Sequence, residues 1–155
     1  MMSIRRFWVV GVAAAALCST APARALPLGF GLGIRLGGAT TRATGALAGV
    51  DVTVPGLALF DGFKGRIDLD TWGQLTSGWD RSSGGIAATF NQVVNGIVGY
   101  YGVGGGFSRI RIHGVAYEGP ELKLIGGFNL LGMGFEVNYH MGKVSTWTGL
   151  VRFRF

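Results

Sequence analysis

The stretch Trp147-Thr148-Gly149-Leu150-Val151-Arg152-Phe153-Arg154-Phe155 decides the fold that this sequence predicts. Its odd positions are aromatic, apolar or glycine, whereas Arg152 and Arg154 occupy even positions. Because successive side chains of a β-strand point to opposite faces, this alternation predicts a strand with one apolar and one polar face. Such a strand suits a closed barrel in a membrane, where Phe153 and Phe155 face the lipid interface and the strand pairs with the first one.

The first 25 residues have the layout of a secretory signal peptide. Arg5 and Arg6 precede an apolar stretch over residues 7–17, and Ala23-Arg24-Ala25 follows. A charged region, a short apolar core and an A-x-A site are the features of a cleaved signal. The apolar stretch of 11 residues is too short to span a bilayer, which needs ~20. We therefore expect cleavage after Ala25 and one domain over residues 26–155.

Composition limits the remaining possibilities. Loss of the signal lowers the basic count from 14 to 11 against eight acids, so the net charge falls from +6 to +3. No run of Lys and Arg remains, and we expect no nucleic-acid partner. No stretch after the signal has 18 continuous apolar residues, which argues against a membrane-spanning helix. The many glycines, without a collagen-like period, fit strands that bend and turn often.

Seven further segments are expected to be strands, and all of them except residues 86–94 alternate in a similar way. The clearest is Leu28-Gly29-Phe30-Gly31-Leu32-Gly33-Ile34-Arg35-Leu36, whose even positions are all large and apolar. Turn signals such as Pro55-Gly56 and Asn95-Gly96 separate the segments. The sequence therefore predicts an all-β fold, an eight-stranded antiparallel up-and-down transmembrane β-barrel. The expected strands are residues 28–36, 47–54, 63–72, 86–94, 97–107 or 97–112, 121–129, 135–141 and 146–155.

The less apolar faces of these strands carry nearly balanced charge, with four acids, five bases and one histidine. On a soluble β-sandwich, which is the alternative fold, they would form a wet surface. Inside a barrel they pair across the lumen, where an unpaired charge would cost several kcal/mol. The residues expected in this luminal polar network are Arg35, Asp51, Arg66, Asp68, Asp70, Lys123, Glu136, His140, Arg152 and Arg154.

The signal segment, the alternating strands, the run Tyr100–Phe107 and the aromatic last strand together resemble the small eight-stranded bacterial outer-membrane β-barrel superfamily of opacity- and porin-like surface proteins. The resemblance implies a location in the cell outer membrane and contact with outer-membrane lipids. It also implies that the barrel-assembly machinery recognises Phe153 and Phe155. Residues 73–85 and 108–120 are the two expected loops long enough to present a surface to an extracellular ligand.

The candidate catalytic residues form no clear motif. Some barrels of this superfamily cleave or transfer lipid A acyl chains with a serine, a histidine and an acid. Here Glu136 shares a face with His140, and Ser145 lies across the next hairpin. Three functions stay open: a structural or surface-interaction barrel with a plugged lumen, a narrow channel or carrier of small hydrophobic solutes, and a lipid-modifying enzyme, which the sequence supports least.

We expect no cofactor or metal. Asp68 and Asp70 have no third ligand nearby, and a GxGxxG phosphate loop starting at Gly102 would need glycine where Phe107 stands. The aromatic residues have two interpretations, a sugar-binding surface and girdles at the two membrane interfaces. We assign most of five aromatic residues to the girdles. These are Trp72, Trp79, Tyr117, Tyr139 and Trp147.

Overall fold

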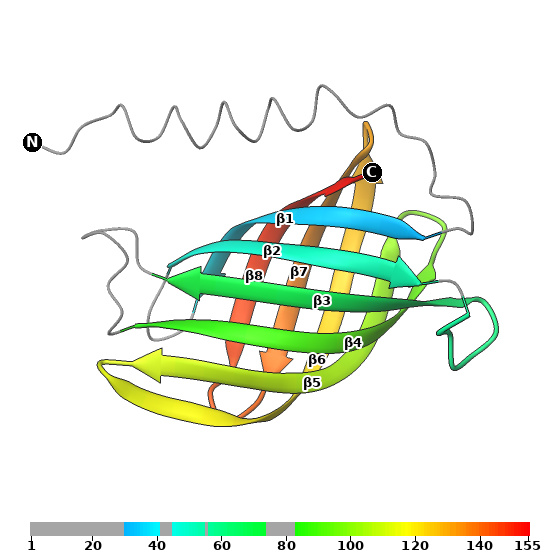
Figure 1. The fold of residues 1–155 in the computed structure, drawn as a ribbon. Coiled ribbons are helices and arrows are strands. Elements are labelled where there is room, and N and C mark those ends of the chain that lie inside the picture. The colour runs from blue at the N-terminus through cyan, green and yellow to red at the C-terminus, as the bar shows by residue number, and fades with distance from the viewer. Residues whose placement is uncertain (1–29, 41–44, 55, 74–82) are drawn as a thin grey trace, which may run out of the picture.

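The structure is a computed structural model that describes residues 30–40, 45–54, 56–73 and 83–155, so the expected signal segment lies outside the described residues. Eight strands form a closed antiparallel barrel (Figure 1), and each pairs with its neighbours in sequence order. The predicted all-β, eight-stranded up-and-down architecture is confirmed. The strands are β1 (Gly31–Thr40), β2 (Gly45–Val54), β3 (Phe63–Gly73), β4 (Gly84–Asn95), β5 (Tyr100–Ile112), β6 (Val115–Leu130), β7 (Met133–Met141) and β8 (Thr146–Arg154).

The barrel closes through β1 and β8, as the alternation of the last segment predicts. Arg35 lies opposite Arg152 in this register, and Leu36 lies opposite Val151. The Phe155 amide extends the ladder by donating to the Leu32 carbonyl at 2.9 Å. Closure gives every strand a partner on both sides, so the barrel wall has no open edge on which other chains could pair.

One predicted loop is wrong. Residues 108–120 form the outer part of a long hairpin, because β5 continues to Ile112 and β6 starts at Val115. His113 and Gly114 make the turn with φ angles of 48° and 83°, the pair of positive values that a two-residue type I′ hairpin requires. Pro120 is accommodated because β6 pairs with β7 only from Leu122 onward, so this part of β6 is an edge.

The other strand boundaries differ less from the predicted ones. The first strand is shifted toward the C-terminus, to Gly31–Thr40. The fifth strand begins at Tyr100, because the Gly96 amide donates to the Gly99 carbonyl at 2.7 Å and closes a turn. Of the predicted loop 73–85, Gly73 ends β3 and Gly84 begins β4, while residues 74–82 lie outside the described part of the chain.

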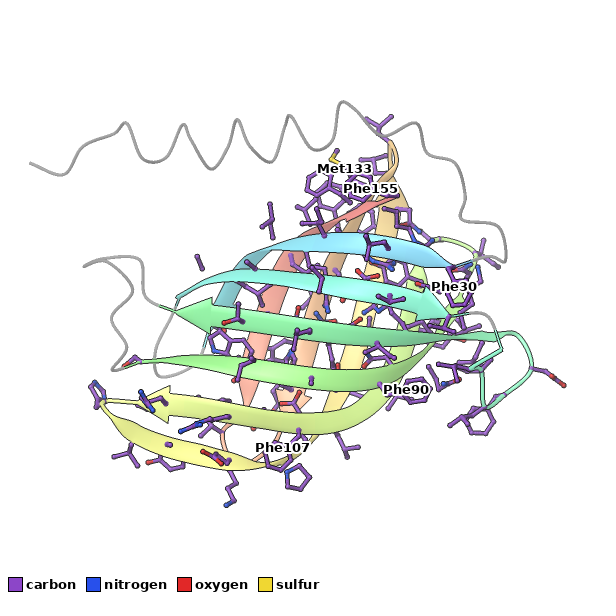
Figure 2. The ribbon with its side chains drawn as sticks, in the orientation of Figure 1. Phe30, Phe90, Phe107, Met133 and Phe155 are labelled. Atoms are coloured by element: carbon purple, nitrogen blue, oxygen red, sulfur yellow. The ribbon has the colours of Figure 1, made fainter. Side chains whose placement is uncertain are left out.

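Side chains alternate between the lumen and the outer wall, and the lumen holds the buried core. Outward positions carry a belt of exposed apolar side chains, and Phe90 and Phe107 lie on this outer wall in Figure 2. No helix among the described residues is long and apolar enough to cross a membrane. The apolar belt comprises Leu32, Leu36, Val50, Val52, Ile67, Leu69, Ile86, Val103, Phe107, Leu122, Leu124 and Val137.

Candidate functional site

Six charged side chains from four strands meet in the lumen, and we call them the central ion cluster. Three are acids and three are bases, so the cluster is neutral as a whole. Each is at most 2% exposed. Its members are Arg35 from β1, Arg66, Asp68 and Asp70 from β3, Lys123 from β6, and Glu136 from β7.

Asp68 is the carboxylate with the most cationic partners in this cluster. Lys123 Nζ donates to it at 2.7 Å, and an Arg66 guanidinium nitrogen donates at 2.9 Å. Arg35 Nη1 forms an ion pair with Asp68 at 2.7 Å and donates to Asp70 at 2.9 Å. Lys123 also donates to Asp70 at 3.1 Å. Three strands that are not all neighbours are therefore joined across the lumen.

Glu136 is the second carboxylate on which several donors converge. Arg35 Nη2 donates to Oε1 at 2.8 Å, and Arg66 Nη1 donates to Oε2 at 2.7 Å. The Tyr100 hydroxyl donates to Oε2 at 3.1 Å. Such charge-assisted bonds offset the large cost of removing these groups from water, and loss of one partner would leave a buried charge uncompensated.

A second ion pair lies toward the end of the lumen where β1 begins and β8 ends, which we call the terminal mouth. Arg152 Nε donates to Asp51 Oδ2 at 2.7 Å, and a second guanidinium nitrogen reaches the other carboxylate oxygen. Arg152 and Arg154 also both donate to the Thr53 hydroxyl, at 3.2 and 3.4 Å. Arg154 is exposed at this mouth, outside the buried network.

His140 pairs with an acid that the sequence analysis missed. Its Nδ1 lies 3.0 Å from Glu121 Oε1, and both residues are buried. Glu136, the acid expected beside His140, is bound instead in the central ion cluster, and Ser145 is exposed. This arrangement contradicts the triad considered from the sequence. Glu121 was missed although it is the first residue of the predicted strand 121–129, where it shares the phase of Lys123 and so points inward.

The opposite mouth of the lumen is filled by apolar side chains, which we call the apolar plug. Trp72 is 2% exposed there, and its ring centroid lies 6.0 Å from that of His140. A partly buried residue of the β7–β8 connection, Val144, packs against this group. The apolar plug consists of Ala39, Leu47, Trp72, Ala87, Ile110, Ile112 and Leu150.

Trp72 therefore lies outside the aromatic girdles, to which most of the five aromatic residues were assigned. Arg66, Asp68 and Asp70 share its phase on β3, and this phase turns the indole inward. Tyr139 and Trp147 do face outward, with ring centroids 4.5 Å apart. Tyr117 is 40% exposed, and Trp79 lies outside the described residues.

Inward-facing glycines make room for the polar side chains. A Cβ at Gly49 would collide with Asp70, and one at Gly33 would collide with Asp51. Outward-facing Gly149 differs, because a Cβ there would meet nothing within 4 Å. Part of the glycine content is thus a steric requirement of a narrow lumen that contains large charged groups.

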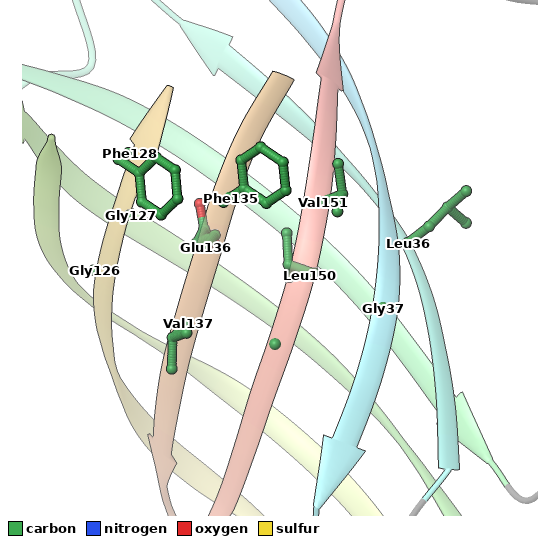
Figure 3. Close-up of a pocket in the computed structure, with 11 residues that line it drawn as sticks. Leu36, Gly37, Gly126, Gly127, Phe128, Phe135, Glu136, Val137, Leu150 and Val151 are labelled. Carbon is green, nitrogen blue, oxygen red and sulfur yellow. The ribbon is translucent and has the colours of Figure 1, made fainter. Parts of the chain in front are cut away.

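The outer wall has a shallow apolar hollow of about 600 Å³ across β6, β7, β8 and β1 (Figure 3). Phe128 and Phe135 stack along it with ring centroids 5.2 Å apart. Gly126 and Gly149 leave its floor without side chains. Among the described residues, no group of three or more His, Cys, Asp or Glu side chains is arranged to hold a metal ion.

Comparison with solved structures finds similar chains in two bacterial proteins. The chain is similar to the N-terminal β-barrel domain of OprF from Pseudomonas aeruginosa, with 14% identity, a TM-score of 0.49, and coverage of 81% of this chain and 97% of that chain. It is also similar to Ail, the attachment invasion locus protein of Yersinia pestis, with 14% identity, a TM-score of 0.40, and coverage of 81% and 96%. No protein-family model and no curated protein sequence matches the chain.

The polarity of the barrel wall defines the class of protein. Charged side chains fill the interior, and large apolar side chains cover the exterior, with Leu69 46% exposed and Val137 55% exposed. This arrangement reverses that of a water-soluble protein and matches a barrel surrounded by lipid, in which closure satisfies every strand. The chain is a closed, eight-stranded antiparallel β-barrel whose apolar outer wall suits a lipid environment.

Proposed function

We propose that this protein is a structural or surface-interaction barrel whose lumen is plugged. The observation that carries the proposal is the filling of the lumen in two stages, the central ion cluster followed by the apolar plug. An ion entering from the terminal mouth would have to break several ion pairs and then pass the closely packed apolar plug, which lies beside His140 and Glu121. Either stage opposes conduction, because passage requires that each binding step be favourable and weak.

The β5–β6 hairpin is the proposed binding surface, in place of a loop over residues 108–120. It projects from the barrel at the end opposite the C-terminus (Figure 1), and Val115 and Tyr117 are exposed on it. A hollow of about 380 Å³ lies where this hairpin meets the β7–β8 connection. Its lining combines apolar and polar groups, which suits an extracellular ligand: Ile112, Tyr117, Lys143, Val144 and Ser145.

The orientation and export of the protein follow from the same proposal. The terminal mouth faces the periplasm, and the β5–β6 hairpin faces the outside. Residues 1–25 are a signal peptide that is removed after Ala25, so mass spectrometry of the exported protein should find Leu26 at its N-terminus. Outer-membrane lipids surround the apolar belt.

Conductance in planar bilayers tests the plugged lumen. We expect no steady ion current through the purified, folded protein. A steady current would contradict the proposal and favour the narrow channel. Acyl release from lipid A is the corresponding assay for the enzyme, and release that His140→Ala abolishes would favour that alternative.

The barrel-assembly machinery is a proposed partner that reads Phe153 and Phe155. The supporting feature is that Phe153 lies on β8, the strand that closes on β1, and that Phe155 directly follows this strand and donates its amide to Leu32. Deletion of Phe155 should impair insertion, because an unpaired edge is prohibitively costly in lipid. Heat-modifiable migration on gels measures assembly, and Phe155→Tyr is the conservative control. Normal localisation of the deletion variant would remove Phe155 from this role.

A further inference from the structure

Two inward-facing cations of the barrel have no acidic partner among the described residues. Asp51 pairs with Arg152, Glu121 pairs with His140, and the three acids of the central ion cluster pair with its three bases. Every described inward carboxylate therefore already has a cationic or histidine partner. Lys64 and Arg154 remain, and no ion pair is formed by either within the described chain.

Both of these cations lie at the terminal mouth, where they border one small cavity. Its volume is about 20 Å³, which is room for a group about the size of one water molecule. No carboxylate lines it. The lining consists of cations, neutral hydrogen-bonding groups and one valine, namely Thr53, Lys64, Arg66, Val93, Asn95, Tyr100, Asn129, Arg152 and Arg154.

The positive charge at this mouth is concentrated. Arg152 and Arg154 both donate to the same hydroxyl, that of Thr53, so two guanidinium groups of like charge are held close together. Asp51, the described carboxylate nearest to them, forms its ion pair with Arg152. An anion at the cavity would relieve this repulsion and would receive further donors from the neighbouring amide side chains.

We infer that the terminal mouth binds a phosphate group, with one oxygen in the cavity and the remainder at its opening. Phosphate fits better than a carboxylate because a phosphate monoester carries about −1.5 to −2 charges at pH 7, which matches two unpaired cations. Arginine also presents its donors in the planar fork that phosphate oxygens accept. This inference goes beyond the proposed function, since a plugged barrel needs no anion.

Calorimetric titration with inorganic phosphate tests the site. The protein would be folded in a non-ionic detergent at low ionic strength, since salt screens exposed charges. We expect saturable binding by the wild type and a rise in Kd of about tenfold or more in K64Q/R154Q, because both charge-assisted contacts are lost. R109Q, which removes one charge from the exposed Arg109–Glu118 pair near the opposite end of the barrel, should bind as the wild type does.

The lipid composition of the bilayer distinguishes two sources of the phosphate group, a lipid headgroup and a soluble phosphate. In bilayers of neutral phosphatidylcholine, free phosphate should bind as in detergent. Added phosphatidylglycerol should suppress that binding if lipid headgroups reach the mouth, and should leave it unchanged if the natural ligand is a soluble phosphate. No saturable binding by the wild type, or equal binding by K64Q/R154Q, would overturn the inference.

A separate control shows whether the variants fold. Heat-modifiable migration shows whether K64Q/R154Q forms the barrel, and K64Q alone is the second variant, because Lys64 is exposed and makes no ion pair within the described chain. A folded K64Q with unchanged phosphate affinity would remove Lys64 from the site. Conductance does not depend on this result, so a failure here is distinguishable from a failure of the plugged-lumen proposal.

Discussion

The two faces of the same barrel wall are stabilised in different ways. On the inner face, specific partners matter: Asp68 contacts three cations, each from a defined strand and at a defined distance. On the outer face, Ile67 and Leu69 occupy alternating positions of the same strand and need only an apolar environment. The inner face therefore tolerates substitution only where a partner is preserved, whereas the outer face tolerates any side chain that lipid accepts.

Gln92 shows how an exception on the outer wall is satisfied. Its side-chain nitrogen donates to the Leu57 carbonyl at 3.0 Å, and its oxygen accepts from the Leu59 amide at 2.9 Å. The β2–β3 connection thus covers a polar side chain on the outer wall. A polar residue is therefore tolerated on either face of the wall when its hydrogen-bond partners are present.

The largest expected effect comes from breaking the central ion cluster. Asp68→Ala should lower the free energy of unfolding by about 3–5 kcal/mol, because it leaves buried cations short of one acid. Urea unfolding in phospholipid vesicles measures this loss. Ile67→Val, which removes one methylene from the outer face of the same strand, should cost only about 0.8 kcal/mol. Similar losses for the two variants would contradict the distinction between the faces.

A charge on the outer face should have the next largest effect. Val137→Arg should cost about 2–4 kcal/mol if Val137 faces the middle of the bilayer. Val115 is the matched control, since it is 56% exposed and Val137 is 55% exposed, but it lies at the tip of the β5–β6 hairpin. Val115→Arg should cost about 0–1 kcal/mol. Equal costs in vesicle unfolding experiments would place both valines in the same environment and contradict the proposed membrane boundary.

Gly→Ala substitutions compare the two faces by adding a single methyl group to each. Gly49→Ala should cost about 1–3 kcal/mol, because the new Cβ would displace Asp70 from its ion pairs. Gly149→Ala adds the same group to the outer wall, where nothing lies within 4 Å. Its effect should stay within about 0.5 kcal/mol. Unfolding midpoints of the two variants check this difference, and a neutral Gly49→Ala would mean that the luminal pairs adapt easily.

The smallest expected effect concerns an ion pair outside the lumen. Arg109 and Glu118 pair at 2.9 Å on the β5–β6 hairpin, but their side chains are 54% and 48% exposed. Arg109→Ala should change the free energy of unfolding by only about 0–1 kcal/mol, because water and salt screen exposed pairs. Unfolding at low and high salt is the measurement. A loss comparable to that of Asp68→Ala would show that burial is not what makes the luminal pairs strong.

Part of the luminal site was accessible to sequence reasoning, through alternation alone. The phase of Arg66, Asp68 and Asp70 identified the inward face of β3, and the same phase would have placed Lys64 and Trp72 inward had it been applied to them. Trp72 was instead grouped with the interface aromatics by residue type. The His113-Gly114 turn was missed because the pair lacks the Asn-Gly or Asp-Gly signature of a tight hairpin.

The sequence by itself determined the strand number, the antiparallel barrel and the face to which most side chains belong, because these depend on a period of two residues along one chain. Only the tertiary structure decided which inward residues meet: that Lys123 binds Asp68 and Asp70, that His140 pairs with Glu121, and that Lys64 and Arg154 at the terminal mouth have no acidic partner among the described residues. Contacts across a lumen depend on strand register and on the stagger with which the barrel closes. Those quantities are set by all eight strands together and by no local pattern.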